Sequence, residues 1–470
     1  MGFAPVQGLW NIIYFSLRSS TYPSRWRRFY LRKVDVLIAG GGDSGLAVFR
    51  VVKTLRPDWE VAIVKPEKGF TFKCPLRYYI SGEIGESNVL HDDEHMFHGA
   101  TLIYAKLVGG DPKEKIAELD NGEKIRYEKL VLATGSKPHI PNIPGVDLEG
   151  VHALRYFPSA KAIAEEAKQA SSVVVVGAGY IATDLADCFK KMGLEVSLVV
   201  RSRVLRTSID SVFSTMVEEQ LTQHGVKVVK GSPVKILGAG RAEGVLLDSG
   251  AEVKGDFIVF ATGIRPVVEP AANLGAAIGY KGIIVDDRLE TTLRDVYAVG
   301  EVAEVRHMIT GESMTVGTAA AAMAQGDVAG FNICGFNIKY PGGLSCLVTK
   351  IFDLYIGAAG LTEDQARAAG FKPIVEKAEY LDHYTVYPGG RKYWARMIYD
   401  SASGRLLGAQ FAGYGNVADK VEAAVLAIRF GAAIADLVTH YSAAFPAATF
   451  NPRFNQFREP AKKVFSEEAK

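Results

Sequence analysis

The sequence has little cysteine and no long apolar run. It has only four cysteines, with no C-x-x-C spacing and no pair close in sequence, so we expect neither a zinc site nor a structural disulfide framework. No stretch of about 18 apolar residues occurs, so we expect no membrane-spanning helix. These absences predict a cytoplasmic protein in a reducing compartment. The cysteines are Cys74, Cys188, Cys334 and Cys346.

A strong excess of either charge is also missing, since the net charge is +2. Residues 1–33 hold six lysines and arginines and no acid, which leaves the rest of the chain mildly acidic. A nucleic acid partner is therefore not expected. The same leader places apolar and aromatic side chains before its arginines. Two interpretations stay open: a segment for peripheral membrane contact or targeting, and an extension that is disordered or packed down.

Glycine is abundant, with 48 residues, and one cluster of glycines has a specific context. The apolar segment 34–39 runs into GGGDSG at 40–45, then into a helical pattern at 46–55 and a second apolar strand at 60–64. Glycines in this turn let the backbone approach a pyrophosphate at a helix N-terminus. The pattern predicts a dinucleotide site formed by Gly40, Gly42, Asp43, Ser44 and Gly45.

The same order of elements returns later in the chain. An apolar strand at 173–176 precedes GAGYIA at 177–182, a helix to about residue 192, and a strand at 195–200. Two glycine motifs, each between a strand and a helix, are hard to obtain by chance. We predict that the second dinucleotide binds at Gly177, Gly179, Tyr180 and Ile181.

Further segments echo one another. YEKLVLATG at 127–135 and DFIVFATG at 256–263 are apolar strands that end in Ala-Thr-Gly, and DVYAVGE at 295–301 ends in Gly-Glu. From about residue 340, predicted strands at 393–399 and 406–411 and a helix at 417–430 indicate a separate C-terminal domain. The residues at the ends of the first three strands are further candidates for cofactor binding. They are Thr134, Gly135, Gly263, Gly300 and Glu301.

With its motifs in this order, the chain resembles the pyridine nucleotide-disulfide oxidoreductase family over about residues 34–455. The resemblance implies an α/β fold with tandem Rossmann-like FAD and NAD(P) domains, as in glutathione reductase, and an α+β C-terminal dimerisation domain. It also implies a homodimer. The expected division is an extension (1–33), an FAD domain (34–150 and 265–335), an NAD(P) domain (151–264) and a dimerisation domain (336–470).

The resemblance assigns roles to several acids, and one expected acid is replaced. Glu301 stands where the family uses an aspartate for the ribityl chain of the flavin, and Asp184 where relatives carry a glutamate near the nicotinamide. Lys65 stands where an acid normally holds the adenosine ribose. Either Glu67 substitutes for that acid, or the ribose is held less tightly.

The second unit also lacks an acid at the end of its second strand. Val200 occupies that position, and Arg201, Arg203 and Arg206 follow. Because guanidinium groups pair with phosphate, this segment favours NADPH, with NADH as the second choice. A solvated basic loop is the competing interpretation.

The candidate redox centre is Cys74, in FKCPLRYYISG. Disulfide reductases with a dithiol carry a second cysteine five positions later, where this chain has Tyr79. The segment resembles the single-cysteine branch instead, which includes coenzyme A disulfide reductases, NADH oxidases and peroxidases, and persulfide or polysulfide reductases. Their pattern is C-G-L-P-Y-Y-I-x-G, from which Pro75 and Arg77 depart.

Cations flank Cys74 in the sequence. We expect Lys73 and Arg77 to lower the pKa of the thiol and to attract a polysulfide or the phosphates of coenzyme A. The alternative is an inert buried cysteine with exposed basic neighbours. By resemblance, Tyr387 and Tyr441 lie near the cysteine of the partner subunit as proton donors, or only pack the interface.

These observations predict an FAD-dependent NAD(P)H oxidoreductase that reduces a disulfide, persulfide or polysulfide, with coenzyme A as a candidate carrier. The alternatives are an oxidase or peroxidase that uses a cysteine sulfenic acid, a sulfide:quinone-type enzyme, and a weakly catalytic redox-signalling flavoprotein. No metal site is expected, because the acids at 92–94 between His91, His95 and His98 indicate a solvated surface.

Overall fold

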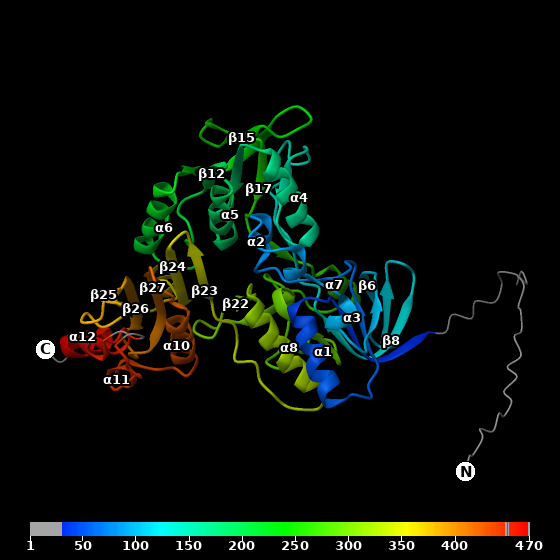
Figure 1. Ribbon diagram of the computed structural model, residues 1–470. Helices are drawn as coiled ribbons and strands as arrows, with labels where there is room; N and C mark the ends of the chain where they lie inside the picture. The colour runs from blue at the N-terminus through cyan, green and yellow to red at the C-terminus, as the bar shows by residue number, and fades with distance from the viewer. Residues whose placement is uncertain (1–30, 447–448, 450, 469–470) are drawn as a thin grey trace, which may run out of the picture.

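The computed structural model describes residues 31–446, 449 and 451–468. Most of the predicted N-terminal extension, residues 1–30, lies outside the described residues. Three large sheets, each with its own helices, form the three bodies seen in Figure 1. Among the helices of the described chain, none has the length and apolar character needed to cross a membrane.

The first sheet combines the N-terminal segment with a strand from much later in the chain. Its strands in spatial order are β5 (Thr101–Ile103), β2 (Val61–Val64), β1 (Arg32–Ala39), β8 (Lys124–Leu132), β7 (Ile116–Leu119) and β6 (Leu107–Asp111), and β20 (Val296–Ala298) also pairs with β8. β1 runs parallel to β2 and β8, and β20 runs parallel to β8. The continuous apolar run of β1 fits a parallel strand that is buried on both faces.

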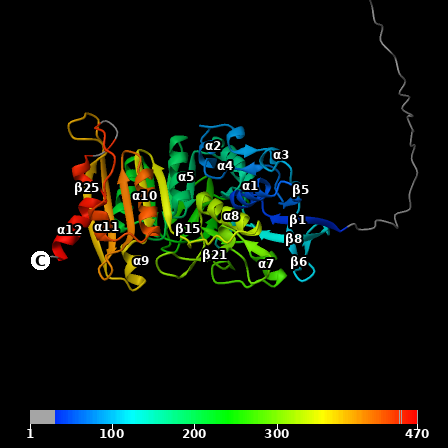
Figure 2. The same cartoon turned by 90° about the horizontal axis from the view of Figure 1, so that it is seen from below.

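Two helices of this body pack closely against each other, α1 (Asp43–Leu55) and α8 (Ala319–Ile333), as both views show (Figure 1, Figure 2). Glycines on α8 allow this approach. A Cβ at Gly326 would overlap the carbonyl oxygen of Ser44 and lie 2.6 Å from the Cβ of Ala47. A Cβ at Gly330 would lie 2.8 Å from the Cβ of Val51. The N-terminal part of α1 therefore packs against the middle of α8.

The second sheet has five parallel strands, which are β10 (Val151–Ala153), β17 (Phe257–Phe260), β11 (Ser172–Val176), β12 (Glu195–Val200) and β13 (Val226–Lys230). Its helices include α4 (Phe157–Gln169), α5 (Tyr180–Lys191) and α6 (Ser211–Gln223). The predicted strand at 195–200 coincides with β12, and the predicted helix after the second glycine motif is α5. Strand, glycine turn, helix and strand thus follow each other as the sequence predicted.

The third sheet is antiparallel, with β23 (Cys346–Ile351), β24 (Leu354–Gly360), β27 (Leu406–Gly413), β26 (Lys392–Asp400) and β25 (Pro373–Leu381) in spatial order. The predicted strands at 393–399 and 406–411 lie in β26 and β27, and the predicted helix at 417–430 is α10 (Ala418–Arg429). This body therefore has the α+β organisation expected for the C-terminal part.

A buried ion pair joins the second and third bodies. The Nε of Arg396 lies 2.6 Å from the Oδ2 of Asp210, and both side chains are almost fully buried. Asp210 also accepts a hydrogen bond from the side-chain amide of Gln410 (2.9 Å) and one from the backbone N–H of Glu363 (3.0 Å). Buried charges need such complete pairing. The two bodies are consequently fixed to each other.

The helix contact at Gly326 leads to the first testable prediction. Replacing Gly326 with valine should force α8 away from α1 and cost about 1–3 kcal/mol by overpacking. Differential scanning calorimetry should then show a lower Tm. Met323→Val, at an exposed position of the same helix, is the matched control and should leave the Tm near the wild-type value. Equal Tm values for both variants would contradict the tight contact.

Candidate active site

The first glycine turn joins β1 to α1 with almost no room for side chains. Gly40 has a φ of +122°, and a Cβ there would overlap the carbonyl oxygen of Ala133. A Cβ at Gly45 would overlap the carbonyl oxygen of Gly40. Gly42 caps α1, and a Cβ there would meet only the Nζ of Lys73, 4.0 Å away. The N-terminus of α1 is therefore open to a ligand, and its free N–H groups favour an anion.

The second glycine turn repeats this geometry between β11 and α5. Gly177 has a φ of +147°, and a Cβ there would overlap the carbonyl oxygen of Ala261. Gly179 caps α5, and a Cβ there would meet nothing within 4 Å. Both predicted dinucleotide turns thus have the same form, with backbone packed behind the turn and open space before the helix.

One cavity of about 730 Å³ connects the two units, a size typical of a cofactor site. It brings together most of the residues predicted from the sequence. Those that line it are Gly40, Gly42, Asp43, Ser44, Lys65, Glu67, Lys73, Cys74, Arg77, Thr134, Gly135, Tyr180, Ile181, Asp184, Gly300 and Glu301.

Other predicted residues lie outside this cavity. Four of them, Gly45, Gly177, Gly179 and Gly263, belong to the backbone turns. The full set is Gly45, Gly177, Gly179, Gly263, Arg201, Arg203, Arg206, Tyr387 and Tyr441. The side chains of Tyr387 and Tyr441 are 46% and 88% exposed, so within one chain they face solvent.

Cys74 opens onto the cavity between β3 (Phe70–Thr71) and α2 (Leu76–Ile80). Protein atoms around the thiol restrict its solvation. This desolvation and the charge of Asp43 raise the pKa of Cys74, and the nearby Lys73 only partly opposes them. The expectation that flanking cations lower this pKa is therefore wrong for the thiol in this protein. The main cause is desolvation of the thiol, and the carboxylate of Asp43, which the glycine turn brings near, adds to it.

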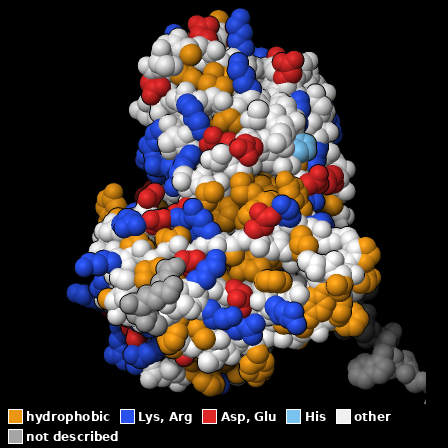
Figure 3. Space-filling view, turned by 90° about the vertical axis from the view of Figure 1, so that its left-hand side faces the viewer, with side chains coloured by type: hydrophobic (Ala, Val, Ile, Leu, Met, Phe, Trp, Pro, Cys, Tyr) orange, Lys and Arg blue, Asp and Glu red, His pale blue; other side chains and the backbone are white. Residues whose placement is uncertain are grey.

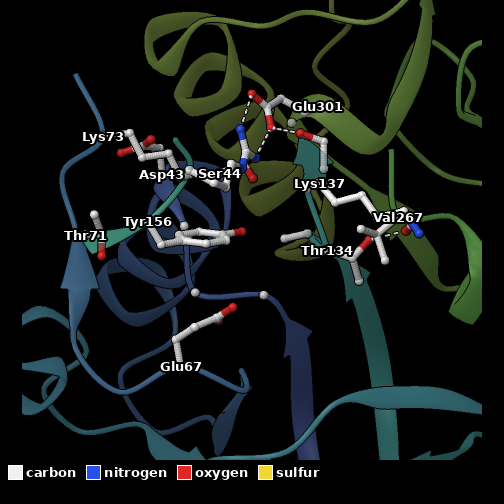
Figure 4. A pocket seen from close by; sticks show the side chains of 18 of the residues that line it. Asp43, Ser44, Glu67, Thr71, Lys73, Thr134, Lys137, Tyr156, Val267 and Glu301 are labelled. Atoms are coloured by element: carbon white, nitrogen blue, oxygen red, sulfur yellow. Dashed lines mark hydrogen bonds and ion pairs between the residues drawn. The ribbon is translucent and has the colours of Figure 1, made fainter. Parts of the chain in front are cut away.

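Lys73 and Asp43 lie close together in the wall of the cavity (Figure 4). Burial and the charge of Arg155 lower the pKa of Lys73, while burial raises the pKa of Asp43. The Nζ of Lys73 also lies 5.2 Å from the ring centre of Tyr156, within reach of a cation–π interaction. The ammonium of Lys73 thus belongs to the cavity and not to an exposed surface.

Arg77 does not flank the thiol as the sequence suggested. Its guanidinium turns to α5, where Nη1 lies 2.8 Å from the Oδ2 of Asp187. It also donates a hydrogen bond of 2.8 Å to the hydroxyl of Tyr78. Arg77 lines the cavity, but its charge is already paired with Asp187 within the protein, so the geometry does not favour its predicted role as a free cation beside Cys74.

Glu301 is held by two groups inside the cavity. The hydroxyl of Ser136 donates a hydrogen bond to its Oε2 (2.7 Å), and Arg155 forms an ion pair with the same carboxylate (Figure 4). Burial alone would raise the pKa of Glu301, but the hydrogen bonds and charge of Arg155 outweigh it, so the pKa is lowered. Glu301 is ionised. Sequence analysis missed Arg155, which lies 146 positions away and belongs to no motif.

Lys65 forms a buried ion pair, with 2.5 Å between its Nζ and the Oδ1 of Asp93. It also donates a hydrogen bond of 2.9 Å to the carbonyl of Gly69. Asp93 accepts further hydrogen bonds from the N–H of Gly69 (2.7 Å) and the hydroxyl of Tyr104 (3.1 Å). The expectation of a solvated surface at 92–94 is therefore wrong for Asp93. Lys65 stands in the position of the usual acid and is paired with Asp93 inside the protein. The nearby Glu67 points its carboxylate into the cavity (Figure 4).

The arginines after β12 have unequal surroundings. Arg203 donates hydrogen bonds to the carbonyl of Ile209 (2.6 Å) and the hydroxyl of Ser214 (2.8 Å), so it stabilises its own loop. Arg201 and Arg206 are exposed. Of the three predicted phosphate ligands, these two have the freer guanidinium groups.

Asp184 lies on the cavity side of α5 and contacts the third sheet. The hydroxyl of Thr349, on β23, donates a hydrogen bond of 2.6 Å to its Oδ1. Burial raises the pKa of Asp184 to about 6, although this hydrogen bond and the charge of Arg77 both oppose the rise. Asp184 therefore changes charge close to neutral pH.

Comparison with known proteins agrees with this geometry. An NAD(P)H sulfur oxidoreductase (CoA-dependent) from Pyrococcus furiosus is 37% identical over 413 residues, which cover 85% of this chain and 92% of that protein. An NADH oxidase from Methanocaldococcus jannaschii is 33% identical over 406 residues, with 83% and 90% covered. The solved structure of an NAD-dependent persulfide reductase from A. fulgidus matches with a TM-score of 0.88 and 27% identity, over 93% of this chain and 84% of that one.

Family models match nearly the whole described chain. The model for pyridine nucleotide-disulphide oxidoreductases covers residues 34–326, and the model for the dimerisation domain of the same family covers residues 347–451. The first match spans the first two bodies, and the second match lies in the third body. With its two glycine turns, shared cavity and cysteine, this chain belongs to the pyridine nucleotide-disulphide oxidoreductase family.

Proposed function

We propose that this oxidoreductase passes electrons from a nicotinamide dinucleotide, by way of FAD, to the sulfur–sulfur bond of a persulfide, polysulfide or disulfide at Cys74. The observation that carries the proposal is a single cavity that contains the first glycine turn, Cys74, and the cavity side of α5. Electron donor, cofactor and acceptor can therefore meet without leaving the protein. The printed names of two relatives, a sulfur oxidoreductase and a persulfide reductase, support the choice of acceptor.

The residues of the first unit fit FAD, the cofactor that the family implies. At Gly40 and Gly45 only a residue without a Cβ leaves room for the turn, and the open N-terminus of α1 suits a pyrophosphate. Lys73 adds a positive charge to this position. Bound FAD supplies two-electron transfer between a nicotinamide and a sulfur centre.

Two acids are assigned to the sugar-like parts of the cofactor. Glu301, kept ionised by Arg155, is the acceptor for the hydroxyls of the ribityl chain. Glu67 is the acceptor for the adenosine ribose, because Lys65 is already paired and Glu67 lines the same wall of the cavity. The Lys65–Asp93 pair ties down the turn that carries Glu67.

The nicotinamide side is assigned to α5. Tyr180, Ile181 and Asp184 all line the cavity, and the carboxylate of Asp184 can accept a hydrogen bond from the carboxamide of the nicotinamide. NADPH is the preferred donor, with NADH second, because β12 ends without an acid and Arg201 and Arg206 follow it.

The sulfur chemistry is assigned to Cys74. Its thiolate attacks one sulfur of R–S–S–R′, which forms Cys74–S–S–R and releases R′S⁻. Two electrons then cleave the mixed disulfide, which restores the Cys74 thiolate and releases RS⁻. The sum converts one NAD(P)H, one proton and one R–S–S–R′ into NAD(P)⁺ and two thiols. Because burial raises the pKa of Cys74, the attack accelerates as pH increases.

An NAD(P)H oxidase or peroxidase is the second candidate. Cys74 is the one cysteine among the described residues that lines the cavity, and it is exposed there. A lone accessible cysteine can carry a sulfenic acid, whose reduction by two electrons restores the thiolate. The relative from M. jannaschii that is named an NADH oxidase favours this alternative.

Assembly into a homodimer is proposed through the third body, which matches the dimerisation domain of the family. Figure 3 shows hydrophobic side chains spread over the surface on this side of the molecule. Exposed aromatic residues of this body include Phe430, Tyr441 and Phe445. In such a dimer, Tyr387 and Tyr441 are the proposed proton donors to the site of the partner. Coenzyme A is proposed as a carrier of the sulfur substrate.

Removing the thiol tests the proposed acceptor site. Cys74→Ser should still allow NADPH to bleach the flavin absorbance anaerobically, but polysulfide turnover should fall at least about 100-fold, because serine cannot form the mixed disulfide. Cys346→Ser is the matched control and should keep both reactions. Full turnover by Cys74→Ser would place the redox chemistry elsewhere.

The basis of cofactor preference can be measured with the exposed arginines. Arg201→Ser combined with Arg206→Ser should lower kcat/KM for NADPH by about 10–100-fold, the loss expected when a phosphate loses charged hydrogen bonds. The value for NADH should remain near wild type. Lys227→Ser, an exposed cation on β13, serves as the control. An equal loss with both nucleotides would argue against contact with the 2′-phosphate.

The role of Glu67 can be tested by cofactor binding. Glu67→Gln should raise the Kd of the apoprotein for FAD by about 10–100-fold, because a charged acceptor for the ribose hydroxyls is lost. Quenching of flavin fluorescence on titration measures the Kd. Glu86→Gln, an exposed acid of the same body, is the control. An unchanged Kd would show that the adenosine ribose is held by another group.

A further inference from the structure

A buried ionic cluster lies between α2, which follows Cys74, and α5. The side chains of Arg77 and Asp187 are only 8% and 0% exposed, and their ion pair is 2.8 Å long. Lys191, which is 40% exposed, reaches the same Oδ2 of Asp187 at 3.1 Å from the surface side. Isolated charges at such depth are strongly unfavourable, so the buried Arg77 and Asp187 depend on each other.

Further contacts of Arg77 and its neighbours hold α2 against α5. The guanidinium of Arg77 lies over the ring of Tyr78, 4.1 Å from its centre, and donates to the hydroxyl of that ring. The thiol of Cys188, on α5, donates a hydrogen bond of 3.2 Å to the backbone carbonyl of Arg77. The short helix α2 is thus fastened to α5 through both its side chain and its main chain.

These contacts join two walls of the active-site cavity. Cys74 stands two residues before α2, and the cavity side of α5 carries Tyr180 and Asp184. Asp184 and Asp187 are three residues apart, so they lie on neighbouring positions of one helix face. In the single-cysteine pattern that the chain resembles, Arg77 is replaced by proline, which cannot form an ion pair. The ion pair of Arg77 therefore departs from that pattern.

We propose that Arg77 is a positioning residue whose buried pair with Asp187 locks the turn that carries Cys74 onto α5. The pair thereby keeps the thiol at a fixed position relative to the nicotinamide side of the cavity. The inference rests on the proposed function for the roles of Cys74 and α5. It adds a structural coupling between the electron-accepting sulfur and the helix that binds the donor.

The first test measures the accessibility of Cys74 in the oxidised holoprotein, by its rate of alkylation with iodoacetamide and mass spectrometry. Arg77→Met should release the turn and raise this rate about fivefold or more. Arg77→Lys, which keeps the charge, should stay close to wild type. Lys191→Gln removes the surface cation from the same carboxylate and should also leave the rate unchanged. A wild-type rate in Arg77→Met would overturn the proposal.

A double variant keeps the test decisive if the Arg77→Met protein does not fold. Combining Arg77→Met with Asp187→Asn removes both buried charges together, which avoids leaving an acid without its main partner. If this double variant retains flavin and melts near the wild-type temperature, its Cys74 should still be alkylated faster than in the wild type. A wild-type rate here would equally refute the locking role.

The second test uses the pH dependence of nucleotide binding. Asp184 is surrounded by Thr349 on β23, Arg77 on α2, Asp187, Lys191 and Tyr180 on its own helix, and Cys74. Its pKa is about 6, and Arg77 opposes a further rise. An ionised Asp184 accepts the carboxamide, so binding weakens as pH falls through this pKa.

Removal of the Arg77 cation should therefore raise the pKa of Asp184, so that nucleotide binding weakens at a higher pH. In Arg77→Gln, the pH at which NADP⁺ affinity for the oxidised holoprotein is halved should rise by about half a unit or more, and Arg77→Lys should restore it. Asp184→Asn should abolish this loss of NADP⁺ affinity at low pH. If the pH at which affinity is halved stayed the same in Arg77→Gln, the result would contradict the coupling between Arg77 and the cavity side of α5.

Neither test requires a sulfur acceptor, so the two proposals can fail separately. If polysulfide is not reduced but the Arg77 variants change alkylation and nucleotide binding as described, the proposed acceptor is wrong and the positioning role stands. If Cys74 is required for polysulfide turnover but the Arg77 variants behave as wild type, the positioning role is wrong.

Discussion

The site depends on how closely backbone can approach backbone at the two glycine turns. Gly40 packs on the carbonyl of Ala133, and Gly177 packs on the carbonyl of Ala261. Each of these alanines begins one of the two Ala-Thr-Gly segments. The repeated glycine and the repeated alanine are thus two sides of one contact, made once in each unit. Any side chain at either glycine would push the end of a strand away and close the space in front of the helix.

The charges inside the cavity are arranged so that each has an opposite neighbour. Lys73 and Arg155 supply two positive charges, and Asp43 and Glu301 supply two negative ones. Burial disfavours the charged form of all four groups, and their mutual attraction counters it. This balance explains why the pKa of Cys74 cannot be judged from its sequence neighbours. Lys73 next to it is already compensated, whereas Asp43 arrives from the distant glycine turn.

Sequence reasoning succeeded where function is encoded locally. The strands, the glycine turns and the cysteine segment are each continuous in the chain, and their periodicity and spacing survive in the structure. It failed for side chains whose partners lie far away, such as Arg77 with Asp187 and Arg155 with Glu301. A cation beside a cysteine in sequence says nothing about where its long side chain turns. Only the packing of α2 against α5 decides that Arg77 faces away from the thiol.

The pair formed by Lys65 and Asp93 constrains how this chain can change over evolutionary time. A single substitution of Lys65 to the acid usual at this position of dinucleotide folds would bury two carboxylates against each other, with no cation between them. A single loss of Asp93 would strand a buried ammonium. Each position is conditional on the other, so an exchange of both residues passes through a destabilised single variant. The identity of residue 65 is therefore set by its buried neighbour Asp93.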